Sequence, residues 1–83
     1  MKITMNLILR YKDYLIDEEK SEVTIEKYIR DIKTFYEWIK DRELTKTLVL
    51  EYKAKFVDEY SPATVNSVLA ALNGFFAYNE WYA

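Results

Sequence analysis

Apolar residues recur at three- and four-residue spacing along almost the whole chain, and this is the period of an amphipathic α-helix. The pattern is strongest between residues 21 and 39. Ser21 precedes it and can cap a helix by accepting a hydrogen bond from an amide of the first turn. The apolar stripe of this segment comprises Ile25, Tyr28, Ile29, Ile32, Phe35, Tyr36 and Ile39. The segment is therefore predicted to be a helix with one buried face.

Three more helices are expected from the same period. The first runs from Asn6 to about Glu19, with Leu7, Ile8, Tyr11, Tyr14 and Leu15 on its stripe and Leu9 and Ile16 beside it. The third starts near Thr45 and ends at about Tyr60, with a stripe of Val49, Tyr52, Phe56 and Tyr60. The fourth has Ser61 as its cap and Pro62 at its first position, where a missing amide costs nothing. One glycine and one proline in 83 residues argue against a sheet with many turns. An all-α, compact four-helix bundle in a single domain, residues 1–83, is the predicted fold.

The composition excludes most catalytic sites. The chain has no cysteine and no histidine, so it cannot hold a disulfide, a cysteine nucleophile, a histidine general base or a typical zinc site. A single glycine excludes a phosphate-binding P-loop. The carboxylates lack the spacing of a calcium loop, and the eight tyrosines lack an activating set of cations. No catalytic residue, metal or cofactor is expected, so the chain is not predicted to be an enzyme by itself.

No apolar run approaches the ~20 residues that would span a bilayer, and residues 1–6 do not resemble a secretory signal. A cytoplasmic protein without a membrane partner is therefore expected.

The charge is unevenly distributed. The net charge is −2. Residues 1–55 contain twelve basic and eleven acidic residues, whereas the charged residues of 56–83 are all acidic, namely Asp58, Glu59 and Glu80. A dedicated nucleic-acid module is expected to be basic. Any electrostatic attraction for an anion must therefore come from the first two thirds of the chain.

The pattern that begins at Ser21 returns at Ser61. The serine, the threonine and the apolar positions of residues 21–36 recur forty residues later, in residues 61–76. Two capped amphipathic helices can share such a pattern by chance or by convergence. Alternatively, the chain contains two similar helix pairs, and the second and fourth helices have related roles.

Both helix starts are candidate phosphate sites. A helix N-terminus presents free amides and a partial positive charge, and Ser21 with Thr24, and Ser61 with Thr64, add hydroxyl groups. These residues are either ordinary caps and first-turn residues or contacts to a DNA backbone.

The outer face of the second helix places Lys27, Arg30 and Thr34 on one line, with Lys33 at its flank. This face is either a solvated surface, with Glu26 and Glu37 as partners, or a strip that faces a DNA groove.

The outer face of the fourth helix carries a strip of small residues, which is flanked by Asn66 and Asn73. These small residues are Ser67, Ala70, Ala71, Gly74 and Ala77. Small side chains allow another body to come close. That body is a neighbouring helix of the same domain, another domain or subunit, or a nucleic-acid groove, in which asparagine can read adenine.

Taken together, these segments resemble the core-binding domain of tyrosine recombinases (phage integrases). The resemblance rests on Ser21-x-x-Thr24-Ile25-x-x-Tyr28-x-x-Asp31-Ile32-x-x-Phe35-x-x-Trp38-Ile39 and on Ser61-Pro62-x-Thr64-Val65-Asn66-x-x-Leu69-x-Ala71-Leu72-x-x-Phe75-Phe76. Tyr11-x-x-Tyr14-Leu15, and Thr45 followed by Val49 and Tyr52, are similar to the family's first and third helices. The four motifs cover nearly the whole chain in the family's order.

The resemblance implies a SAM-like bundle of orthogonal helical hairpins that forms half of a clamp around duplex DNA at the core recombination site. It implies that a catalytic domain, absent from these 83 residues, follows after a linker, and that this domain and other recombinase protomers are partners in a phage or bacterial protein. With the helix starts and outer faces described above, the predicted DNA-binding residues are Ser21, Thr24, Lys27, Arg30, Lys33, Ser61, Thr64, Asn66 and Ser67, and a protein interface would use Ala70, Gly74 and Ala77. The sequence departs from the family in having no charge at Ser67 and Asn73, and no lysine or arginine after Lys55. A protein-interaction module that docks a catalytic domain or another protomer is the alternative function.

Overall fold

The computed structural model describes residues 2–81, which form four α-helices and no strand. The helices are α1 (Met5–Asp17), α2 (Glu22–Ile39), α3 (Lys46–Glu59) and α4 (Pro62–Tyr78). The predicted all-α four-helix class is confirmed. The first helix ends at Asp17, two residues before the predicted end.

The N-cap residue before each helix carries a hydroxyl group, and each hydroxyl accepts a hydrogen bond from the amide three residues later. The four pairs are Thr4 with Leu7, Ser21 with Thr24, Thr45 with Leu48, and Ser61 with Thr64. An N-cap of this kind satisfies one of the free amides of the first turn and stabilises a helix by about 1 kcal/mol. The caps explain why the helices start where they do.

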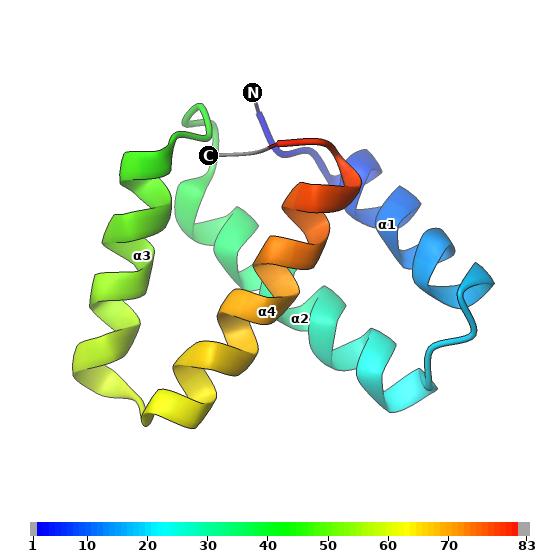
Figure 1. The fold of residues 1–83 in the computed structure, drawn as a ribbon. Helices are drawn as coiled ribbons and strands as arrows, with labels where there is room; N and C mark the ends of the chain where they lie inside the picture. Colours follow the sequence, from blue (N-terminus) through cyan, green and yellow to red (C-terminus); the bar gives the residue numbers. More distant parts are fainter. Residues whose placement is uncertain (1, 82–83) are drawn as a thin grey trace.

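The four helices form two hairpins, α1–α2 and α3–α4 (Figure 1). Helices α2 and α4 make the most extensive contact between elements, and Figure 1 shows them crossing as an X, with α1 and α3 on opposite sides of the crossing. The N-terminal ends of α2 and α4 both lie at the lower edge in this view. The crossing therefore determines where the two predicted phosphate sites lie relative to each other.

Two aromatic contacts repeat between the hairpins. Tyr11 of α1 meets Phe75 of α4 edge-on, with ring centroids 5.5 Å apart and an interplanar angle of 67°. Tyr52 of α3 meets Phe35 of α2 in the same way, at 4.8 Å and 71°. Phe35 and Phe75 are forty positions apart, and Tyr11 and Tyr52 are forty-one apart. These contacts support the interpretation of the sequence as two similar helix pairs.

The core lies around the α2–α4 crossing and takes residues from every helix. Its largest fully buried side chains are Ile8, Ile32, Phe35, Ile39, Tyr52, Leu72 and Phe75. Two residues that the sequence placed on buried stripes are instead exposed: Tyr14 is 40% exposed and Tyr60 49% exposed. Both lie close to helix ends, where their rings pack against neighbouring aromatic rings instead of entering the core.

Candidate nucleic-acid interface

The starts of α2 and α4 have the same local geometry. Ser21 Oγ accepts a bond of 3.2 Å from the Thr24 amide and donates one of 2.8 Å to Thr24 Oγ1. Ser61 Oγ makes the equivalent bonds to Thr64 at 3.4 and 3.2 Å. Each cap satisfies one amide. The amides of Glu22 and Val23 in α2, beside the acidic Glu22 side chain, and the amide of Ala63 in α4 can meet an anion, whereas Pro62 has no N–H to offer. The structure thus places two matched anion-compatible ends on one side of the molecule (Figure 1).

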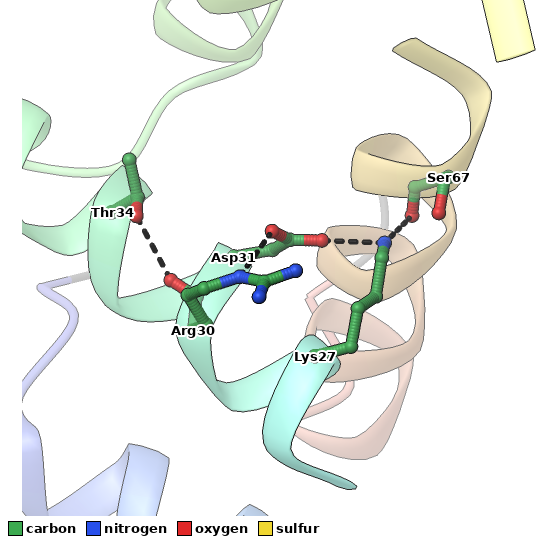
Figure 2. A network of polar contacts seen from close by, with 5 residues as sticks. All are labelled: Lys27, Arg30, Asp31, Thr34 and Ser67. Atoms are coloured by element: carbon green, nitrogen blue, oxygen red, sulfur yellow. Dashed lines mark hydrogen bonds and ion pairs between the residues drawn. The ribbon is translucent and has the colours of Figure 1, made fainter. Parts of the chain in front are cut away.

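Lys27 lies at the α2–α4 crossing. Its ammonium donates a hydrogen bond of 2.9 Å to the backbone carbonyl of Ser67 and lies 2.5 Å from Asp31 Oδ2 (Figure 2). The Lys27 side chain is only 27% exposed. Lys27 and Ser67 are forty positions apart, so equivalent residues of the two similar helices meet where the helices cross. Lys27 therefore joins α2 to α4, a role that neither interpretation of this face had included.

Arg30 is the more accessible cation of the pair. Its side chain is 71% exposed, and its Nε lies 3.9 Å from Asp31 Oδ1. The Thr34 hydroxyl donates a hydrogen bond of 2.9 Å to the Arg30 carbonyl and is thus occupied within the helix. Lys33 is exposed at the flank of α2, as the sequence predicted. Arg30 and Lys33 are the cations of α2 with the greatest freedom to meet an anion.

Helix α4 contributes uncharged groups. Asn66 and Ser67 are exposed, as is Thr64. The bond from Lys27 uses the Ser67 backbone carbonyl and not its hydroxyl. The two sides of the crossing therefore differ, because α2 carries the charges and α4 carries short polar side chains.

The strip of small residues on α4 is divided by the fold. Ala71 is fully buried, so its prediction as part of an outer face is wrong. A Cβ at Gly74 would lie 2.6 Å from the hydroxyl oxygen of Tyr11, so the glycine allows α1 to pack closely on α4. Of the three sequence-predicted interface residues, Ala70 and Ala77 are exposed, and Gly74 meets a helix of its own domain. Contact of Ala70 or Ala77 with another domain stays a prediction.

Ala70, Gly74 and Ala77 also line a surface pocket of about 660 Å³ between α1, α2 and α4. The other side chains around this pocket are Tyr11, Tyr14, Leu15, Lys20, Thr24, Tyr28 and Tyr78. Hydrogen bonding to Glu18, the nearby charge of that carboxylate and partial desolvation raise the pKa of Tyr14 above its usual value. The Tyr14 ring also stacks on Tyr11 and packs against Tyr78, so these aromatic side chains form one wall of the pocket.

Asp31 belongs to this region, although it was not among the predicted site residues. Its side chain is only 12% exposed. It lies four residues after Lys27, a spacing at which ion pairs form on a helix. Asp31 also acts on α3: burial, followed by the charges of Asp31 and Tyr60, raises the pKa of Tyr52 to about 12. Among the described residues, the Tyr52 hydroxyl has no hydrogen-bond partner. The i to i+4 spacing was the signal that could have identified the pair.

Within residues 2–81, no helix is long and apolar enough to cross a membrane. The same part of the chain holds no cluster of three potential metal ligands.

Comparison with known proteins gives one finding. A family model described as phage integrase, N-terminal SAM-like domain, matches residues 8–82, which include most of α1 and all of α2, α3 and α4. No curated protein and no solved structure matches the chain.

Proposed function

Because this chain belongs to the phage integrase (tyrosine recombinase) family, as its N-terminal SAM-like domain, we propose that it binds duplex DNA during integration or recombination. The SAM-like domain is not the catalytic domain of these proteins. We further propose that a separate domain of the full-length protein cleaves and joins the strands, and that other protomers assemble on the same DNA.

The observation that best supports DNA binding is the pair of matched helix starts on one side of the α2–α4 crossing. In this proposal, first-turn amides and the hydroxyls of Ser21, Thr24, Ser61 and Thr64 contact phosphates. A single helix start is common in proteins. Two with the same geometry, joined through Lys27 and Ser67, offer an extended polyanion two contact points at a fixed separation.

The cations of α2 supply the remaining attraction. Arg30 and Lys33 reach the DNA backbone, and Lys27 contributes from the crossing. Asn66 and Ser67 approach the DNA as short polar groups on α4. With a net charge of −2 and roughly three to five phosphate contacts, the isolated domain is expected to bind weakly, with a Kd of roughly 10⁻⁴ to 10⁻⁶ M at physiological salt.

A chemical-shift titration of the ¹⁵N-labelled domain with a mixed-sequence DNA duplex tests this function. The amides at the starts of α2 and α4 are expected to shift together and to saturate with one Kd. The Kd is expected to rise steeply with salt, because each phosphate contact contributes a slope of about 0.9 to the dependence of log Kd on log salt. No binding in dilute buffer, or shifts confined to α3, would contradict the proposal.

Arg30→Ala identifies the cationic side of the interface. Loss of one phosphate contact is expected to weaken binding and to reduce the salt slope by about one. Lys53→Ala is the matched control, because it removes the same charge from an exposed position of α3. Equal losses from both variants would show that only the overall charge matters.

A further inference from the structure

Asp31 occupies a position where a carboxylate is costly. Its side chain is only 12% exposed at the α2–α4 crossing, and its Oδ2 is buried. The equivalent residue of α4, forty positions later, is Ala71, which is fully buried. A half-buried carboxylate destabilises a fold unless a cation compensates it. Because alanine fills the equivalent place, packing alone does not require an acid at residue 31.

The carboxylate lies between two cations, as Figure 2 shows. Asp31 Oδ2 is 2.5 Å from Lys27 Nζ, and Asp31 Oδ1 is 3.9 Å from Arg30 Nε. Both cations are among the residues proposed to meet DNA. Asp31 therefore holds Lys27 in a close ion pair, whereas the mostly exposed Arg30 side chain is only loosely associated with it.

The geometry determines what Lys27 can offer to a ligand. An ammonium has three donor hydrogens. The Lys27 ammonium donates one hydrogen bond to the Ser67 carbonyl, forms an ion pair with Asp31 and lies 5.7 Å from the centroid of the Tyr28 ring. A free lysine loses rotamer freedom when a ligand fixes it, and a lysine already held in place loses less. Asp31 thus helps to hold the partly exposed Lys27 side chain in place, which reduces the entropic cost of binding a phosphate.

We propose that Asp31 is a positioning residue for DNA binding, which holds Lys27 against Ser67 so that the Lys27 ammonium meets a phosphate in a preset arrangement beside the freer Arg30. This inference rests on the proposed function. It assigns to a negatively charged residue a favourable effect on the binding of a polyanion. Simple electrostatics assigns it the opposite effect.

The sign of one substitution therefore tests the proposal. Asp31→Asn removes the charge at nearly constant shape, and positioning predicts a Kd that is roughly threefold to tenfold higher, the size of a lost hydrogen bond. If Asp31 were only a negative charge close to DNA, the same variant would bind more tightly. Glu37→Gln is the control for net charge, because it neutralises an exposed carboxylate elsewhere on α2.

A second step asks whether Asp31 acts through Lys27. In a Lys27→Gln background, Asp31→Asn is expected to have less than half of its effect on Kd, because the residue that it positions is missing. Circular dichroism confirms that each variant is folded at the titration temperature. If Asp31→Asn does not fold, Asp31→Glu replaces it. That variant keeps the charge and moves the carboxylate, so positioning predicts at least twofold weaker binding.

The outcomes separate this inference from the proposed function. If the wild-type domain binds no DNA in dilute buffer, the proposed function fails and this inference fails with it. If the wild-type domain binds and Asp31→Asn binds equally or more tightly, only the positioning role is overturned.

Discussion

Helices α2 and α4 bury nearly the same pattern of side chains at positions forty residues apart. Ile25 corresponds to Val65, Ile32 to Leu72 and Phe35 to Phe75, and all six are buried. Each helix begins at a serine that caps a threonine.

Their polar faces differ at the same offset. Where α2 has Lys27, Arg30, Asp31 and Thr34, α4 has Ser67, Ala70, Ala71 and Gly74. The similar core positions let both helices occupy equivalent places in the bundle. The different polar positions let α2 carry the charges and let α4 approach α1 closely. Similarity of packing therefore does not imply similarity of chemistry.

The largest expected effect tests the shared core. Phe35→Ala and Phe75→Ala each remove a fully buried ring that meets a tyrosine edge-on. Each is expected to lower the free energy of unfolding by about 3–5 kcal/mol. Urea unfolding followed by circular dichroism measures both. Because the two sites are equivalent, the losses should agree within about 1 kcal/mol, the usual context-dependent scatter. A much larger difference would show that the two helix pairs are alike only in sequence.

Where the alanine variants do not fold, Phe35→Leu and Phe75→Leu repeat the comparison at a cost of about 1–3 kcal/mol each.

The second prediction concerns a position where the two helices differ. Gly74→Ala gains about 1 kcal/mol of helix propensity. However, its Cβ would lie 2.6 Å from the Tyr11 hydroxyl oxygen, on a ring that is 3% exposed and held among other rings. We expect a net loss of about 1–2 kcal/mol from this overpacking, measured by thermal and urea unfolding.

Tyr11→Phe removes that oxygen, and the nearest remaining atom, Cζ, lies 3.8 Å from the Cβ. In this background Gly74→Ala should stabilise the domain by about 1 kcal/mol. Thr34→Ala is the matched control in α2 and should change stability by no more than about 0.5 kcal/mol. A loss from Gly74→Ala that persists without the Tyr11 hydroxyl would contradict this account.

How well the sequence predicted each part depends on how local the cause is. The starts of α2 and α4 were predicted to the residue, because Ser21, Ser61 and Pro62 act within one turn. The small residue at Gly74 predicted close approach of another body, and a neighbouring helix of the same domain was one of the alternatives. The residue that approaches, Tyr11, was not predictable, since it belongs to another helix. Lys27 was predicted on an outer face because the pattern of its own helix does not show that the α4 backbone crosses there.

The third prediction concerns the pKa of Tyr52, a buried residue of α3 that is affected by the charge of Asp31 on α2. Burial and the Asp31 charge raise its pKa to about 12, above the usual value of about 10 in an unfolded chain. The folded domain therefore binds this proton more tightly than the unfolded chain does. This contribution to stability is fully present below pH 10, and it is lost as the pH rises from about 10 through about 12. The pKa of Tyr11 is also raised, mainly by burial, so its contribution has the same sign.

Tyr52→Phe isolates the effect. At neutral pH it should raise stability by about 1 kcal/mol, because the buried hydroxyl has no hydrogen-bond partner among residues 2–81. The variant should also lose part of the alkaline decline, as measured by urea unfolding across the pH series. A clear loss of stability at neutral pH would instead indicate that the hydroxyl is satisfied in solution.

The smallest expected effect tests whether the matched caps are equally strong. The bonds of Ser21 are shorter than those of Ser61, at 3.2 and 2.8 Å against 3.4 and 3.2 Å. In addition, Pro62 fixes the backbone at the first position of α4 and lowers its dependence on a side-chain cap. We expect Ser21→Ala to cost about 1 kcal/mol and Ser61→Ala about half of that. Serine-to-glycine variants are the controls, because glycine is tolerated at an N-cap with a loss of only a few tenths of a kcal/mol. If Ser61→Ala costs more than Ser21→Ala, bond length and proline do not determine cap strength here, and the two helix starts differ by a cause outside their first turns.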